Sequence, residues 1–250
     1  MSGKVYLLGA GPGDRELLTL KALRALQEAN VVLHDDLVTA EILALAASTA
    51  QVYNVGKRCG RKKITQEEIN AQMVAYANDG LTVVRLKGGD PLIFSRAAEE
   101  MHALRAAGIP FEVVPGVTAA SAAAAAARIP LTDRRLASRL AFLSAHHCAG
   151  KAPFDWLAAL APDTTIVLYM PGNGLPELAG ELTRAGLHLE TPCLIISRAS
   201  APDEQIHRTI LRELSQAPRL PPPAILIIGA VARTGSSAEL LEATGARLES

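Results

Sequence analysis

Short apolar runs, each the length of a β-strand, recur through the first half of the chain and alternate with stretches of helical periodicity. The runs contain few polar residues, which is typical of strands buried on both faces of a parallel sheet. They occupy residues 5–8, 31–33, 52–55, 82–86 and 111–114, and helical periods occupy residues 17–28, 65–78 and 96–107. This alternation predicts a mainly parallel sheet that is covered by helices.

A second series of strand-sized runs begins after a pause in the pattern at residues 129–135. Its runs occupy residues 140–143, 165–169, 193–196 and 224–228. Residues 119–127 are almost all alanine, too short and too weakly apolar to cross a bilayer, and we interpret them as a tightly packed helix. The sequence therefore predicts two α/β domains, residues 1–134 and 135–250.

The composition argues against several classes of protein. Lys and Arg together number 25, as do Asp and Glu, so no overall charge attracts nucleic acid. Every apolar stretch is interrupted before it reaches membrane-spanning length. The three cysteines lack the spacing of a disulfide framework or a zinc site, so we expect reduced thiols and no metal. A globular, cytoplasmic protein with a small ligand is the expectation.

A glycine-rich turn, Gly-Ala-Gly-Pro-Gly-Asp at residues 9–14, follows the first strand and precedes a helix. Its position resembles that of a dinucleotide-binding loop. The third glycine, however, follows the second after two residues where the dinucleotide fingerprint requires three, and Pro12 lies between them. The spacing disfavours a nicotinamide oxidoreductase. Taken alone, the turn is equally compatible with glycines that only allow the chain to bend.

Several further motifs follow in a fixed order. They are Asp-Asp-Leu-Val at residues 35–38, Val-Gly-Lys-Arg at 55–58, Gln-Glu-Glu-Ile-Asn at 66–70, Val-Arg-Leu-Lys-Gly-Gly-Asp-Pro at 84–91, and Val-Val-Pro-Gly-Val-Thr-Ala at 113–119. With the glycine turn, this set resembles the tetrapyrrole methylase family over about residues 3–232. Residues 55–70 are most similar to the members that methylate uroporphyrinogen III.

The resemblance implies two α/β domains with S-adenosylmethionine in the cleft between them, and a homodimer. It implies a cofactor pocket formed by Pro12, Gly88, Gly89, Asp90, Ile93, Thr118 and Ala119, with Met170 and Ala199 from the second domain. The residue types suit this role: paired glycines let the backbone approach a ligand closely, and the carboxylate of Asp90 accepts hydrogen bonds from a ribose.

The resemblance also implies that Asp35 is the catalytic base and Lys57 a proton donor. Methylation at a ring carbon leaves a cationic macrocycle that must lose a proton, which a positioned carboxylate accepts. From the residues alone, Asp36 is an equal candidate. A third interpretation is that the two aspartates only cap a loop.

Uroporphyrinogen III, the implied acceptor, has eight carboxylates, so a neutral protein needs a local basic surface. Five of the seven residues at positions 57–63 are basic, and a second basic group lies at residues 128–139. We expect the substrate-binding residues to be Arg58, Arg61, Lys62, Arg134 and Arg135. A solvated or RNA-binding loop remains the alternative for residues 61–63.

The chain departs from the family pattern where relatives have Gly-Arg-Gly-Gly-Glu-Glu. Residues 95–100 read Ser-Arg-Ala-Ala-Glu-Glu, with three glycines lost. The implied reaction is methylation at two ring carbons, C2 and C7, through precorrin-1 to precorrin-2, in sirohaem or cobalamin biosynthesis. The departure keeps two alternatives open: a later precorrin or another acceptor, and a weakly active cofactor-binding paralogue.

Overall fold

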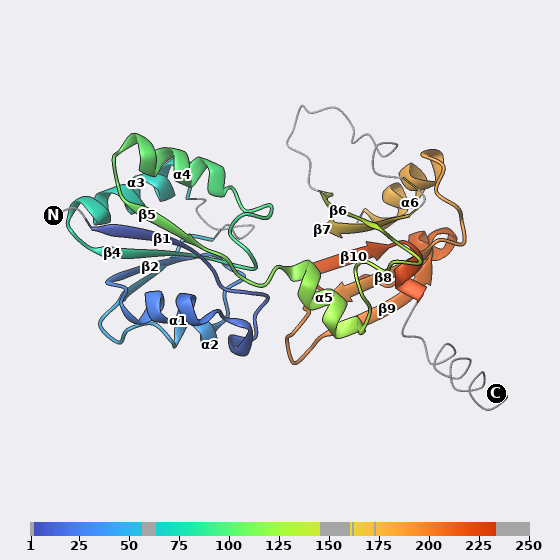
Figure 1. Cartoon of the computed structure of the whole chain (residues 1–250), viewed down its shortest axis with the longest axis horizontal. Helices are drawn as coiled ribbons and strands as arrows, with labels where there is room; N and C mark the ends of the chain where they lie inside the picture. The colour runs from blue at the N-terminus through green and yellow to red at the C-terminus, as the bar shows by residue number, and fades with distance from the viewer. Residues whose placement is uncertain (1–2, 57–63, 146–160, 162, 173, 234–250) are drawn as a thin grey trace. The chain divides into compact units, whose positions relative to one another are not determined.

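The computed structural model describes residues 3–56, 64–145, 161, 163–172 and 174–233. These residues form two compact units, divided between Ala119 and Ala120 (Figure 1). The sequence places a boundary after residue 134. The difference between the two boundaries is the segment 120–134, which the structure groups with the second unit.

The first unit contains a fully parallel sheet of five strands in the order β3-β2-β4-β1-β5. The strands are β1 (Lys4–Gly9), β2 (Val31–His34), β3 (Gln51–Asn54), β4 (Thr82–Lys87) and β5 (Phe111–Val114). Most residues of β1, β2 and β4 are buried, as their largely apolar sequences predict, whereas the edge strand β3 is exposed.

Helices cover both faces of this sheet (Figure 1). On one face, α1 (Leu20–Gln27) and α2 (Ala40–Leu43) pack on Val84 and Leu86 of β4. On the other, α3 (Gln66–Asn78) and α4 (Ala97–Ala106) pack on Val83. Side chains along a strand alternate between faces, so Arg85 and Lys87 point to the same side as Val83.

The first residues of α3 satisfy their backbone groups locally. The side chain of Thr65 accepts a hydrogen bond from the backbone NH of Glu68 (3.1 Å), and the Glu68 carboxylate accepts one from the NH of Thr65 (2.7 Å). This capping box fixes where α3 begins. It therefore also fixes the position of Gln66, the first residue of the helix, near the carboxyl ends of the parallel strands.

The second unit contains a mixed sheet in the order β6-β7-β10-β8-β9. Its strands are β6 (Arg139–Ser144), β7 (Thr164–Tyr169), β8 (Pro192–Ser197), β9 (Gln205–Ile210) and β10 (Ala224–Ile228). Only β6 and β7 pair in parallel. The sequence predicts four of these strands and misses β9, a largely exposed edge strand.

The helical elements of the second unit include the predicted alanine helix, α5 (Ala119–Ala127), of which five alanines are buried. Helix α6 (Leu175–Arg184) packs with the 3₁₀ helix η3 (Leu211–Gln216) on the sheet. In the described part of the chain, the other 3₁₀ helices are η1 (Arg15–Leu17), which belongs to the first unit, and η4 (Ala230–Arg233), which belongs to the second. The side chain of Arg208 joins two of these elements, because it donates to the carbonyls of Ala127 (3.1 Å) and Ala232 (3.3 Å).

Candidate active site

The candidate site lies where the parallel strands of the first unit end. Because the strands run in one direction, the loops after β1, β2, β4 and β5 meet at one edge of the sheet, which we call the carboxyl edge. Ligands of open parallel sheets bind at this edge. The predicted site residues Pro12, Asp35, Gly88–Asp90, Ile93 and Thr118 all belong to these loops.

Two of the loops are joined directly through their backbones. Gly11 donates to the carbonyl of Gly89 (3.1 Å), and Gly89 donates to the carbonyl of Gly11 (2.7 Å). Gly89 has φ +69°, a left-handed conformation that suits glycine. Among the described residues, and apart from its chain neighbours, a Cβ atom there would have only the backbone nitrogen of Ala119 within 4 Å, at 3.8 Å. The backbone at Gly89 is thus open to close approach by a ligand.

The loop after β5 packs tightly against the same pair of loops. A Cβ atom on Gly116 would lie 2.4 Å from the carbonyl oxygen of Gly89 and 2.9 Å from the Cα atom of Gly9. No side chain fits at such distances. Glycine at residue 116 is therefore required for the three loops to meet, a role that the sequence analysis did not assign to it.

Asp90 links the loop after β4 to the loop after β5. One carboxylate oxygen accepts from the backbone NH of Leu92 (2.8 Å), and the other accepts from that of Gly116 (3.0 Å). A carboxylate has about four acceptor positions. Asp90 can therefore hold both loops and still accept a hydrogen bond from a ligand hydroxyl.

The loop after Asp90 has an unusual backbone at two non-glycine residues. Phe94 has φ 49° and Arg96 has φ 61°, both in the left-handed region. The Ser95 hydroxyl donates to the carbonyl of Pro91, and the Arg96 guanidinium donates to both oxygens of Glu99 (2.7 and 2.6 Å). This is the element that departs from the family pattern. Strained conformations of this kind cluster at functional sites.

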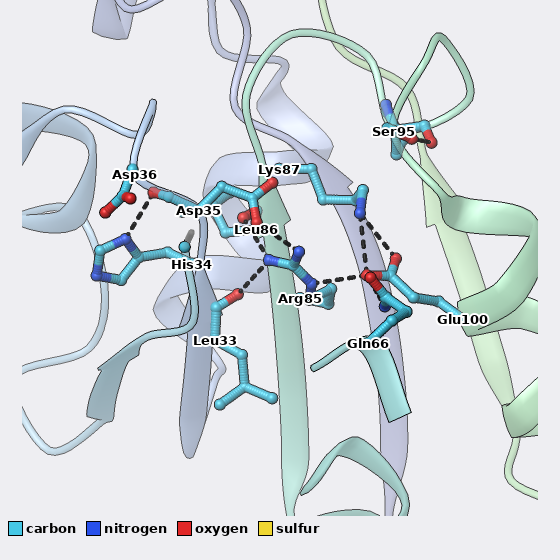
Figure 2. A network of polar contacts seen from close by, with 12 residues as sticks. Leu33, His34, Asp35, Asp36, Gln66, Arg85, Leu86, Lys87, Ser95 and Glu100 are labelled. Atoms are coloured by element: carbon cyan, nitrogen blue, oxygen red, sulfur yellow. Dashed lines mark hydrogen bonds and ion pairs between the residues drawn. The ribbon is translucent and has the colours of Figure 1, made fainter. Parts of the chain in front are cut away.

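Asp35 follows β2 and forms an ion pair with Arg85 of β4. The Nη2 atom of Arg85 donates to Oδ1 of Asp35 at 2.5 Å, and the Arg85 side chain is only 3% exposed (Figure 2). The Arg85 Nη1 atom donates to the carbonyls of Leu33 and Leu86, both at 3.3 Å. The guanidinium is held on several sides, and it in turn fixes the Asp35 carboxylate.

Behind Arg85 lies a buried carboxylate, Glu100 of α4. It accepts from Nε of Arg85 (2.9 Å), from Nζ of Lys87 (2.9 and 3.0 Å) and from Nε2 of Gln66 (3.2 Å) (Figure 2). Burial lowers the pKa of Arg85, but the charges of Asp35 and Glu100 outweigh burial and the pKa is raised. Burial and the nearby charge of Arg85 lower the pKa of Lys87.

We call Gln66, Arg85, Lys87 and Glu100 the Glu100 cluster. All four residues lie within the sequence motifs described above, but no motif by itself assigns them a role. A signal was present, because Arg85 and Lys87 occupy alternate positions of a strand whose other residues are apolar or Thr. Charged residues that point to one buried face of a central strand require partners there.

Asp36 has a different environment from Asp35. Its Oδ1 atom accepts from the side-chain amide of Asn54 (2.9 Å), the last residue of the neighbouring strand β3. A Cβ atom on Gly56 would lie 2.4 Å from the Asp36 carboxyl carbon. Asp36 thus packs against the segment after β3, and this contact gives it a structural function.

Other predicted site residues are placed in the second unit or lie outside the described residues. Met170 follows β7 with φ 54°, and Ala199 follows β8 between Arg198 (φ 50°) and Ser200 (φ 69°). Arg134 is exposed, and Arg135 is ion-paired with Asp133 (3.2 Å). Lys57, Arg58, Arg61 and Lys62 lie outside the described residues.

Two general properties bear on the class of site. In the described part of the chain, no three His, Cys, Asp or Glu side chains are grouped so that they could hold a metal ion. Among the same residues, no helix has the length and apolar character needed to cross a membrane. Cys193, in β8, is a free thiol whose pKa burial raises to about 12.

Comparison with known proteins supplies the class. The family model for the tetrapyrrole (corrin/porphyrin) methylases matches residues 4–215. Uroporphyrinogen-III C-methyltransferase of Paracoccus denitrificans (strain Pd 1222) is 47% identical over 235 residues, which are 92% of this chain and 82% of that protein. Siroheme synthase 1 of Klebsiella pneumoniae subsp. pneumoniae is 46% identical over 231 residues, and the chain spans only 49% of its length.

A solved structure agrees with these relatives. The uroporphyrin-III C-methyl transferase of Thermus thermophilus, complexed with S-adenyl homocysteine, matches with a TM-score of 0.79 and 42% identity over 92% of this chain and 94% of that chain. The chain belongs to the tetrapyrrole (corrin/porphyrin) methylase family. It is a methyltransferase, and the expected family and α/β fold are confirmed.

Proposed function

We propose that the protein transfers methyl groups from S-adenosylmethionine to two ring carbons, C2 and C7, of uroporphyrinogen III, through precorrin-1 to precorrin-2. The observation that supports this most is the fixed Asp35 carboxylate, ion-paired with Arg85 at 2.5 Å at the carboxyl edge. The names and extents of the relatives from Paracoccus denitrificans and Thermus thermophilus support the choice of acceptor.

The loops at the carboxyl edge fit a nucleoside-containing cofactor. The open backbone at Gly89 allows a ligand to approach, and the Asp90 carboxylate keeps acceptor positions for a ribose hydroxyl. We assign Pro12, Gly88, Ile93, Thr118 and Ala119 to the same pocket because they lie on the same loops or directly follow them. Met170 and Ala199 remain proposed contacts from the second unit.

When bound, S-adenosylmethionine supplies a methyl group that is already activated as an electrophile. The main task of the protein is then to align the methyl carbon with the ring carbon. Once the ring is methylated, the macrocycle is cationic and must lose a proton from a bridging carbon. Asp35, with one oxygen held by Arg85, accepts that proton at its carboxylate, and Lys57 acts as the proton donor.

The acceptor's carboxylates need basic partners. We propose Arg58, Arg61 and Lys62, and in the second unit Arg134 and Arg135, as these partners. Arg134 is exposed, and the Arg135 side chain is 83% exposed despite its pair with Asp133, so both can contact an anion. We further propose that the protein acts as a homodimer in the cytoplasm and that its product feeds sirohaem or cobalamin synthesis, which the family resemblance supports.

The test is an anaerobic incubation of the purified protein with S-adenosylmethionine and uroporphyrinogen III, followed by mass spectrometry of the tetrapyrrole. We expect a product with two added methyl groups. Calorimetry with S-adenosylhomocysteine serves as the matched measurement of the cofactor site. Cofactor binding without any methylated product, in conditions where a related enzyme is active, would refute uroporphyrinogen III as acceptor and favour a later precorrin or a weakly active paralogue.

A further inference from the structure

The Glu100 carboxylate lies in an unusual place for a charged group. It is 0% exposed, and the two cations that donate to it, Arg85 and Lys87, are 3% and 2% exposed. Burying charges costs several kcal/mol per ion, and a well-packed apolar cluster is often at least as stable as a buried ion pair. Stability of the fold therefore gives a poor reason for the Glu100 cluster, and its contact with Asp35 gives a better one.

The donors of Arg85 are divided between Glu100, two backbone carbonyls and Asp35. Nε donates to Glu100 (2.9 Å), Nη1 to Leu33 and Leu86 (3.3 Å each), and Nη2 to Asp35 (2.5 Å). The planar guanidinium is thus held by Glu100 at one end and meets Asp35 at the other (Figure 2). Any rotation that improved one contact would weaken the others.

We propose that Glu100 is a positioning residue for Asp35: it holds Arg85 in the orientation that fixes the Asp35 carboxylate, and Lys87 supplies the balancing positive charge. This inference rests on the proposed role of Asp35 as the base. Glu100 itself touches neither the substrate nor the cofactor in this account. It acts only through Arg85, which is why its effect is on the basicity and orientation of Asp35.

The charges of Asp35 and the three ionisable members of the Glu100 cluster balance when all four groups are ionised. Asp35 and Glu100 contribute two negative charges, and Arg85 and Lys87 contribute two positive charges. Among the described residues, other titratable groups nearby are His34 and Asp36 beside Asp35, Glu67 of α3, and Arg96 with Glu99 at the start of α4. Replacing Glu100 by glutamine leaves an excess positive charge beside Asp35, which favours the ionised carboxylate and makes it a weaker base.

The first test is the variant Glu100→Gln in the methyl-transfer assay. We expect kcat to fall about 10- to 100-fold, KM for both substrates to change little, and the acid limb of the kcat–pH profile to move to lower pH. The matched control is Glu99→Gln, which makes the same change at the neighbouring, exposed glutamate. We expect the acid limb of this control to stay at its wild-type pH. An unmoved acid limb in Glu100→Gln would overturn the proposal, since a purely structural role lowers activity without shifting the limb.

Variants at Lys87 test the charge balance with the opposite sign. Lys87→Met removes a positive charge, so the acid limb should move to higher pH. The double variant Lys87→Met with Glu100→Gln restores the balance and should return the limb toward its wild-type position. If Glu100→Gln alone does not fold, Lys87→Met and the double variant still decide the matter, and an acid limb that is unmoved in Lys87→Met would overturn the proposal.

A measurement without turnover separates this inference from the proposed function. In protein labelled with ¹³C at the aspartate carboxyl carbons, the Asp35 signal is identified by its loss in Asp35→Asn. Its titration should move to lower pH in Glu100→Gln and to higher pH in Lys87→Met. An inactive wild-type protein would refute the proposed function alone, whereas an Asp35 titration unchanged in both variants would refute the positioning role.

Discussion

The Asp90 carboxylate accepts a hydrogen bond from the backbone NH of Gly116 at 3.0 Å, which ties the loop after β4 to the loop after β5. The other Asp90 oxygen accepts from Leu92 at 2.8 Å, within its own loop. One side chain therefore holds two of the loops that form the proposed cofactor pocket. Asp90 therefore shapes the proposed pocket through two acceptor positions and keeps others for a ligand hydroxyl.

Asp90→Ala is expected to weaken cofactor binding more than it lowers the rate of methyl transfer. The variant loses both backbone contacts and the proposed ribose acceptor, so S-adenosylhomocysteine affinity should fall about tenfold or more, with stability lower by about 1–3 kcal/mol. Calorimetry and thermal unfolding measure the two effects. Asp90→Asn retains one oxygen acceptor and should be affected less; equal loss in both variants would show that hydrogen-bond acceptance is not the cause.

Gly116→Ala is expected to destabilise the first unit. Its Cβ atom would lie 2.4 Å from the Gly89 carbonyl oxygen, so the loops must separate, at a cost of about 1–3 kcal/mol and with weaker binding of S-adenosylhomocysteine. Gly180→Ala, within α6, is the matched control. A Cβ atom there meets no atom of the described residues within 4 Å, so the variant should be more stable by about 0.5–1 kcal/mol. In chemical denaturation, the free energy of unfolding should fall in Gly116→Ala and rise in Gly180→Ala. A Gly116→Ala variant as stable as the wild type would contradict the packing described.

The stability of the first unit should depend on pH through Glu112 of β5. Hydrogen bonds from Lys21 and Lys4 (2.7 Å to Lys4) lower the pKa of Glu112 from 4.5 to about 2. The pKa of Glu112 is lower in the folded than in the unfolded protein. Its ion pairs therefore stabilise the fold above the unfolded-state pKa, and this stabilisation is lost as the pH falls through the folded-state pKa. Glu112→Gln should lower the melting temperature slightly at pH 7, with a difference that narrows between about pH 4.5 and 2.

The salt dependence of this difference tests whether the charge interaction of Glu112 is its cause. The carboxylate and both lysines are solvent-accessible, so added salt should reduce the difference between wild-type and Glu112→Gln protein at neutral pH. A difference that persists at high salt and at pH 2 would indicate that the substitution acts through packing on β5 and not through charge.

The periodic part of the fold was predictable because burial acts on every residue of a central strand. Four strands of the second sheet have nearly continuous apolar runs, which predict them; β9, Gln-Ile-His-Arg-Thr-Ile, is polar at four of its six positions and lies at an edge of the sheet, so its sequence does not predict a buried strand. The division between the units depends on the unit to which α5 belongs, and the contact from Arg208 of β9 to the Ala127 carbonyl is one that periodicity does not specify.

The site was only partly predictable for a similar reason. Motif order identified the loops at the carboxyl edge, but it could not distinguish Asp35 from Asp36, which are adjacent in the sequence. Their partners distinguish them: Arg85 holds Asp35, and Asn54 holds Asp36. Asp35 and Glu100 lie 65 positions apart in the sequence and are linked because both pair with Arg85. No short sequence motif predicts this link.

The kcat of Asp35→Asn in the anaerobic assay with uroporphyrinogen III, measured beside wild-type protein and Asp36→Asn, tests whether Asp35 is the base. We predict that the wild-type protein adds two methyl groups and that Asp35→Asn loses about 10²–10⁴-fold in kcat while S-adenosylhomocysteine affinity is retained. Asp36→Asn should keep most of its turnover. An active Asp35→Asn together with an inactive Asp36→Asn, or a wild-type protein that methylates nothing, would contradict the account.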